Sequence, residues 1–276
     1  MTYATLMVHL ELGASNKGLL QVAGDFAERF QANVIGIAAA QPMQMIYNDG
    51  YYSGDLVQLD RTEIEKEIKA AEGEFRTALR GLADKLEWRS TVSFSPLANY
   101  LAHQARSADL IITGVDHKNS FLDSSRHVYM GDLVMQVGRP VLIVPTSASG
   151  LHLNKVIVGW TDTRETRRAI VDALPLLKKT AHVLVVEITP ESELELARGR
   201  LRDVVRWLDG HGVAAKSLAT PTFADDATHL AKIARENGAD VIVAGAYGHS
   251  RLREWALGGV TRDLLLTADR CALVSH

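Results

Sequence analysis

Short runs of apolar, β-branched residues alternate along this chain with longer segments whose apolar residues recur every three or four positions. In the first half the short runs are Thr5–Val8, Val34–Ala38, Thr91–Ser95, Leu110–Thr113 and Val141–Val144. Short continuous apolar runs are typical of buried parallel strands, and a spacing of three and four marks one face of a helix. The alternation therefore predicts an α/β fold with a parallel sheet that helices cover on both faces.

The clearest helical segment carries six apolar residues on one face: Ile64, Ile68, Ala71, Phe75, Leu79 and Leu82. Asp60, with Glu63 three residues later, has the spacing of a capping box and predicts that this helix begins near Asp60. A second helix is expected over Leu97–Arg106.

The same order of elements starts again after Ser147–Gly150, so the chain contains two copies of one unit. Val156–Val158 parallels Leu6–Val8 at an offset of 150 residues, whereas Ala239–Gly245 parallels Ala108–Gly114 at an offset of 131. The first half therefore contains about 19 additional residues, most of them within 41–59. This segment is either a lid over a pocket or, as we prefer, a surface loop that its aromatic residues attach to the neighbouring domain.

We expect two domains, residues 1–147 and 152–276, joined by a short linker. Their last strands, Val141–Val144 and Ala272–Val274, are apolar and would each close one edge of a sheet. Because exposed edge strands invite pairing, we expect these two strands to associate within the chain, as a pseudo-dimer. The sequence leaves open whether two chains also form a homodimer.

Composition narrows the class of protein. The chain has 276 residues, a formal net charge of −3 and a single cysteine, Cys271. Neither half has the basic excess of a nucleic-acid-binding protein, and no apolar run is long enough to span a membrane. One cysteine excludes a disulfide framework and a CxxC metal or redox site. The expected protein is cytoplasmic, with neither nucleic acid nor membrane as a partner.

The turn after the fourth strand of the second half is rich in glycine. Gly245 and Gly248 follow that strand, and Gly258 and Gly259 precede a helical pattern over Val260–Leu266. Glycine lets backbone N–H groups approach an anion closely, and a helix N-terminus adds its dipole. Side chains that could donate further hydrogen bonds follow these glycines: His249, Ser250 and Thr261. The pattern predicts a phosphate site.

Gly245-x2-Gly248-x9-Gly258 resembles the G-x2-G-x9-G-(S/T) signature of ATP-binding universal stress proteins. Each half of the chain resembles one domain of that family, so the resemblance covers nearly the whole chain, as in tandem members. It implies two flavodoxin-like or Rossmann-like domains, each a five-stranded parallel sheet with helices on both faces. It also implies a stress-response protein that binds ATP or another adenine nucleotide, with or without Mg²⁺, in the second domain. The implied binding residues are Thr161, Asp162, Ile188, Ala244, Gly245, Gly248, His249, Ser250, Gly258, Gly259, Val260 and Thr261.

Two departures from the family pattern concern the second half. Gly259 stands where the signature has Ser or Thr, so one phosphate-binding hydroxyl is missing. Thr161 occupies the position of the family's nucleoside-binding Asp, and Asp162 follows one residue late. Asp162 would therefore either reach the ribose or cap the next helix.

The first half departs further. Only Gly114 of its motif survives, while His117 and His127 replace the other two glycines, Val128 replaces the hydroxyl residue and Glu11 takes the Asp position. Bulky side chains would block the approach of a phosphate to the backbone, so this half is expected not to bind ATP in the usual way.

No pair of residues stands out as a nucleophile with its base, and no catalytic or metal-binding residue is expected. Any ATP hydrolysis would be slow. Alternative interpretations are a scaffold or interaction protein of the same fold that binds no nucleotide, and a nucleotide-consuming enzyme on a related fold.

Overall fold

The computed structural model describes residues 2–42, 54–115, 125–223, 225–246 and 269–276. The first half contains β1 (Thr5–His9), α1 (Lys17–Phe30), β2 (Asn33–Ala40), α2 (Gly54–Leu79), β3 (Leu86–Val92), α3 (Leu97–Gln104), η1 (Ala105–Ser107), β4 (Leu110–Gly114), α4 (Met130–Val137) and β5 (Val141–Val144). The second half contains β6 (Lys155–Gly159), α5 (Arg164–Asp172), α6 (Leu174–Leu177), β7 (His182–Thr189), η3 (Glu191–Glu193), α7 (Leu194–Gly210), β8 (Ala215–Pro221), α8 (Asp226–Glu236), β9 (Val241–Gly245) and β10 (Cys271–Ser275).

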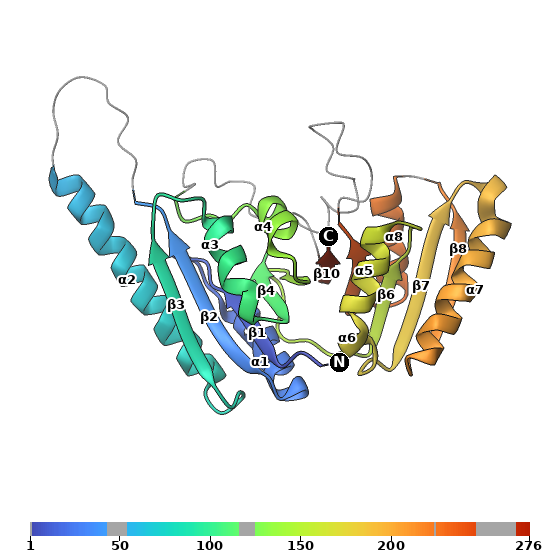
Figure 1. The fold of residues 1–276 in the computed structure, drawn as a ribbon, viewed down its shortest axis with the longest axis horizontal. Coiled ribbons are helices and arrows are strands. Elements are labelled where there is room, and N and C mark those ends of the chain that lie inside the picture. Colours follow the sequence, from blue (N-terminus) through green and yellow to red (C-terminus); the bar gives the residue numbers. More distant parts are fainter. Residues whose placement is uncertain (1, 43–53, 116–124, 224, 247–268) are drawn as a thin grey trace, which may run out of the picture.

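All ten of these strands form one sheet, in the order β3-β2-β1-β4-β5-β10-β9-β6-β7-β8. Five parallel strands come from each half, and the two sets join where β5 and β10 pair antiparallel, with Leu142 opposite Leu273. Figure 1 shows the two half-sheets meeting near β10. The α/β fold class and the pairing of the last strands are therefore confirmed.

Helices cover both faces of the sheet because successive strand residues point to opposite sides. Leu6 and Val8 pack into a core shared with α1, α2, α5 and α7, and this core continues across both halves. Met7, between them, packs into a second core with α3, α4 and α8. Equivalent helices of the two halves thus lie on the same face.

Contacts outside the sheet also hold the two halves together. The buried Tyr3 hydroxyl donates a hydrogen bond to the backbone carbonyl of Asp172, at 2.8 Å. Burial, with smaller contributions from the Asp172 and Asp109 carboxylates, raises the pKa of Tyr3, so the phenol keeps the proton that it donates. The Lys179 ammonium lies 5.6 Å from the centre of the Phe30 ring.

Two local predictions were wrong. The strand expected at Thr91–Ser95 runs over Leu86–Val92, because an edge strand with polar residues lacks the apolar run that marks a buried strand. α2 begins at Gly54, so Asp60 lies inside the helix, where it pairs with Arg126 at 3.5 Å instead of capping it.

Other expectations fall partly outside the described residues. The helix expected over Val260–Leu266 lies there, as does most of the 41–59 segment, whose last residues belong to α2. Within the described part of the chain, no helix has the length and apolar character needed to cross a bilayer.

The joint between β5 and β10 predicts a clear difference between two leucines. Leu273 is fully buried at this joint, so Leu273→Ala should lower the free energy of unfolding by about 2–5 kcal/mol. Leu196 on α7 is 66% exposed, and Leu196→Ala should change the free energy of unfolding by less than about 0.5 kcal/mol. Urea unfolding of both variants tests this, and equal losses would contradict a central role for the joint.

Candidate functional site

In each half, the order in which successive strands are added to the sheet reverses at one point, so that strands on the two sides of this point are added in opposite directions. β6 lies between β7 and β9, and β1 lies between β2 and β4. Open parallel sheets bind ligands at the carboxyl ends of the strands flanking such a point. These two crevices, at β6/β9 and at β1/β4, are therefore the candidate sites.

Five of the predicted nucleotide-binding residues lie at the β6/β9 crevice or beside it. Thr161 and Asp162 follow β6, Ile188 is near the end of β7, and Ala244 and Gly245 end β9. Backbone pairing holds these ends together, with Gly159 opposite both Val186 and Ala244. The other predicted residues lie outside the described part of the chain: Gly248, His249, Ser250, Gly258, Gly259, Val260 and Thr261.

Gly245 has a packing role that the sequence motif does not reveal. A Cβ at this position would lie 2.5 Å from the backbone nitrogen of Thr166 and 2.7 Å from the carbonyl carbon of Glu165. The first turn of α5 therefore packs directly against the end of β9, and only glycine permits that approach.

The start of α5 is capped by Thr163, so the alternative role of Asp162 as the cap is wrong. The Thr163 Oγ1 accepts a hydrogen bond from the Thr166 N–H at 3.3 Å. Asp162 is exposed, and its negative charge is one of the smaller contributions that raise the pKa of Arg200. A hydrogen bond with Glu187, at 3.0 Å, is the main cause that raises the pKa of Arg200.

A buried carboxylate lies beside this crevice. Burial alone would raise the pKa of Glu165, but its hydrogen bond with Arg164 and smaller contributions from neighbouring groups bring it below its usual value. Glu165 therefore carries a negative charge at neutral pH.

The equivalent crevice of the first half is open. A cavity of about 760 Å³ lies at the ends of β1, β4 and β5, and its lining includes His9, Glu11, Lys17, Thr113, Gly114 and His127. The chain needs residues 10–16 to pass from β1 to α1, but only residues 160–163 to pass from β6 to α5. Among the residues that the structure describes, a Cβ on Gly114 would meet no atom within 4 Å, whereas a Cβ on Gly245 would overlap the first turn of α5.

The polar groups of this cavity are organised in pairs. The buried His9 Nδ1 lies 3.0 Å from the Thr113 Oγ1. His127, which replaces a motif glycine, is buried with its Nδ1 3.9 Å from a Glu11 carboxylate oxygen. Asn16 holds the backbone of Glu11 through two hydrogen bonds of 3.0 Å.

Burial lowers the pKa of His9 to about 4, against the smaller opposing effect of Glu11, so its ring is neutral at pH 7. The described residues include no group of three or more His, Cys, Asp or Glu side chains placed to hold a metal ion. The cavity therefore offers hydrogen-bonding groups and one carboxylate–imidazole pair to a ligand.

Sequence reasoning missed this cavity because it followed the glycines into the second half. The available signal was the longer connection between the first strand and first helix of the first half. Its effect depends on where α1 packs, which residue spacing does not reveal.

Comparisons with known proteins agree with this architecture. No family model matches the chain. In sequence it is 25% identical over 122 residues to a universal stress protein of Methanocaldococcus jannaschii, a match that covers 43% of this chain and 74% of that protein.

Solved structures match over the full length. A universal stress protein from Archaeoglobus fulgidus superposes with a TM-score of 0.74 at 14% identity, covering 98% of this chain and 95% of that one. A functionally unknown protein from Pseudomonas aeruginosa gives a TM-score of 0.63 at 18% identity, covering 99% and 92%. The resemblance to tandem universal stress proteins is confirmed.

The neutral state of His9 predicts a pH dependence of stability. The folded pKa of about 4 lies below the ordinary value of 6.5, so on acidification the unfolded chain takes up a proton first. Stability from this group is complete above about pH 6.5 and is lost as the pH falls to about 4, by at most on the order of 3 kcal/mol.

Urea unfolding from about pH 7.5 to about pH 4.5 measures this loss. His9→Asn retains a polar atom for Thr113 and should flatten the profile, whereas His152→Asn, at an exposed position, should leave it unchanged. A His9→Asn profile with the parent slope would contradict the assignment.

Proposed function

We propose that this chain, which resembles the universal stress proteins and shares their fold, binds ATP or a related adenine nucleotide in its second half. The observation that carries the proposal is the placement of exposed Thr161 and Asp162 at the β6/β9 crevice, beside Ala244 and Gly245 where the glycine motif begins. Ligand sites of open parallel sheets occur at such points.

Apolar residues beside the crevice suit a nucleobase. Ile188 and Ala244 both contribute to the core on the α8 side of the sheet, so they can contact one planar ring from the same face. Asp162 would accept hydrogen bonds from the ribose hydroxyls. The glycine-rich turn would bind the phosphates, which in turn would hold any Mg²⁺.

Binding, with hydrolysis slow at most, is the proposed activity. Cys271, the one cysteine, is buried in β10, and burial raises its pKa to about 12, which leaves it protonated and unreactive. We also propose residues 1–147 and 152–276 as the two domains. A scaffold role without nucleotide is the alternative, and titration of the intact chain with ATP separates the two.

The two crevices can be compared in the intact chain with matched glycine substitutions. Gly258→Val should abolish nucleotide binding, because a branched side chain would keep the backbone of the motif away from a phosphate. Gly114→Val should leave binding unchanged, since a Cβ at Gly114 lies in the open first-half cavity. Calorimetric titration with ATP should give one site per chain.

The open cavity of the first half is the specific observation that favours a second location for the ligand. Loss of binding in Gly114→Val, but not in Gly258→Val, would place the nucleotide there. No binding by the parent would favour the scaffold.

Gly259→Ser should strengthen binding, because it restores the hydroxyl that the family signature places beside the phosphates. A hydrogen bond to a neutral group contributes about 0.5–1.5 kcal/mol and one to a charged group about 1.5–3 kcal/mol. The ATP affinity should therefore rise about threefold to a hundredfold. Dissociation constants for ATP and AMP provide the test, and equal gains for both would mean that the hydroxyl does not contact the outer phosphates.

A further inference from the structure

The cavity of the first half has a positive end, which is the first turn of the 14-residue helix α1. The backbone N–H groups of Lys17, Gly18 and Leu19 have no acceptor among the described residues, and all three residues line the cavity. The side chain of Asn16 does not cap the helix, because it bonds to the backbone of Glu11 instead. The first turn contains no acidic residue, so the Lys17 ammonium adds its charge to the positive end of the helix dipole. An anion complements this wall of the cavity.

His9 contributes a hydrogen-bond acceptor to the same cavity. Its side chain is 5% exposed, and its Nδ1 lies 3.0 Å from the Thr113 Oγ1. The Thr113 hydroxyl donates to the Met130 sulfur at 3.8 Å, so it accepts from the His9 Nδ1–H and leaves the lone pair on Nε2. Nε2 makes no hydrogen bond within the described part of the chain and is not enclosed by protein atoms, so it opens into the cavity. A hydroxyl group complements this acceptor.

The linker between the two halves forms another part of the wall. A Cβ on Gly18 would lie 2.4 Å from the Ala148 carbonyl oxygen, and a Cβ on Gly150 would lie 3.7 Å from the side chain of Gln21. Ser149, between these two contacts, is therefore held beside the start of α1, and it lines the cavity. Its exposed hydroxyl is a further donor for an anion at α1.

The two kinds of polar group and the volume of the cavity limit what fits. The Glu11 carboxylate is directed to His127, with 3.9 Å between Oε1 and Nδ1, so the pair offers hydrogen bonds to hydroxyl groups and leaves the anion to α1. A volume of about 760 Å³ exceeds what one small anion fills. A phosphate ester offers three terminal oxygens to the first turn of α1 and Lys17, whereas a carboxylate offers two.

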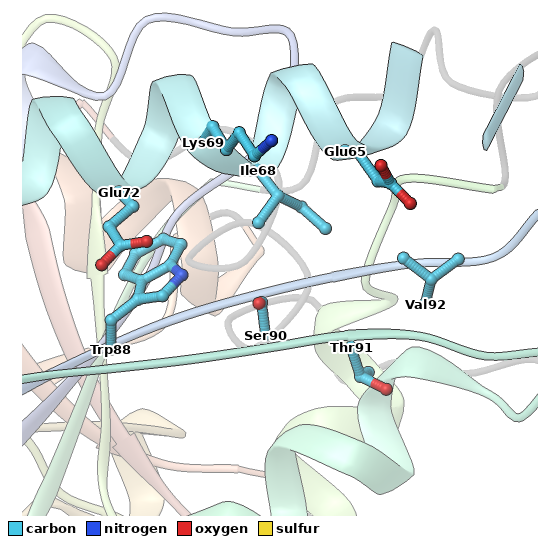
Figure 2. Close-up of a pocket in the computed structure, with 8 residues that line it drawn as sticks. All are labelled: Glu65, Ile68, Lys69, Glu72, Trp88, Ser90, Thr91 and Val92. Carbon is cyan, nitrogen blue, oxygen red and sulfur yellow. The ribbon is translucent and has the colours of Figure 1, made fainter. Parts of the chain in front are cut away.

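A smaller cavity, of about 420 Å³ between α2 and β3, lacks this combination (Figure 2). Its charged side chains all come from α2, and one of them, Glu72, is ion-paired with Arg76 at 2.8 Å. The Nε1 of Trp88 is enclosed by protein atoms, so no ligand can reach it. Of these two cavities, the one in the first half therefore presents accessible groups for an anion and for a hydroxyl.

We propose that the first-half cavity binds a small hydroxylated phosphate ester, of the size of a sugar monophosphate. Its phosphate accepts hydrogen bonds from the first-turn N–H groups of α1, from the Lys17 ammonium and from the Ser149 hydroxyl. A hydroxyl group of the same ligand donates to the Nε2 of His9. His127 and Val128 occupy the motif positions before α4, so this phosphate lies at α1 instead.

Calorimetric titration of the full chain tests the chemistry of the ligand. The phosphate esters are glycerol 3-phosphate, ribose 5-phosphate and glucose 6-phosphate, and they are compared with glycerol, ribose, glucose, gluconate and inorganic phosphate. We expect at least one ester to bind, with gluconate and inorganic phosphate at least about tenfold weaker and no binding of the uncharged compounds.

Amide hydrogen exchange locates the bound phosphate. The ester that binds should slow exchange at least about threefold at Gly18 and Leu19, whose N–H groups it would occupy. Exchange at Thr228 should not change, because the first turn of α8 is already capped by Asp225.

Two matched pairs of variants test the donors. Lys17→Gln should lower the affinity for the ester about tenfold, whereas Lys178→Gln, at an exposed position outside the cavity lining, should not change it. Ser149→Ala should lower the affinity about threefold to tenfold, and Ser147→Ala, at an exposed linker position outside the lining, should not.

His9→Asn tests the acceptor separately from the anion site. Asparagine retains a polar atom for Thr113 but removes Nε2. The affinity for the ester should fall about threefold to tenfold, while the affinity for inorganic phosphate should not change. Equal losses for both probes would contradict a hydroxyl contact at Nε2.

Glycine variants separate this site from the nucleotide site proposed for the second half. Gly114→Val would place a branched side chain in the cavity and should abolish binding of the ester, whereas Gly258→Val should retain it. The proposal is overturned if no ester of the panel binds, if gluconate or the uncharged compounds bind as tightly, or if Lys17→Gln and Gly114→Val both bind like the parent. None of these results changes the outcome of the ATP titration.

Discussion

The antiparallel pairing of β5 with β10 is the constraint on which the rest of this structure depends. A parallel sheet must be covered on both faces and still has two open edges, and here the last strand of each half closes an edge of the other. Leu142 and Leu273 meet there without any exposure to solvent. Because this joint leaves equivalent helices on the same face, a single core runs from α2 through to α7, and the two halves cannot separate without exposing it.

Within that frame, the length of one connection makes two related crevices different. Gly114 and Gly245 occupy equivalent positions at the ends of β4 and β9. The short connection before α5 brings Thr166 against Gly245, whereas the longer connection before α1 leaves Gly114 facing a cavity. The half with the complete glycine motif thus has the more tightly packed strand ends, and the half with the degenerate motif has the larger described opening. The presence of the glycine motif therefore does not determine how much space is open at the strand ends.

The sequence could predict the elements whose burial is simple. Val141–Val144 is apolar throughout and forms β5 with the predicted bounds. β3 was misplaced because Glu87, Arg89 and Ser90 interrupt its pattern, as expected of an outer strand with one free edge. The spacing of Asp60 and Glu63 is also compatible with the interior of a helix, so it could not fix the start of α2. The cavity around His9 depends on the packing of α1 against a distant strand, which local spacing does not encode.

The position of Trp88 at the sheet edge is determined from inside the protein. A Cβ on Gly36 of β2 would lie 2.7 Å from the Trp88 ring and 2.9 Å from Phe75, so glycine at that position lets both rings lie over the strand. Gly36 is paired in turn with Val8 of β1, one residue before His9. The ladder that holds His9 at the floor of the cavity therefore also orients the indole at the edge. One ladder of backbone hydrogen bonds thus connects the first-half cavity with the packing at the outer strand, and the absence of a side chain at Gly36 is what permits that packing.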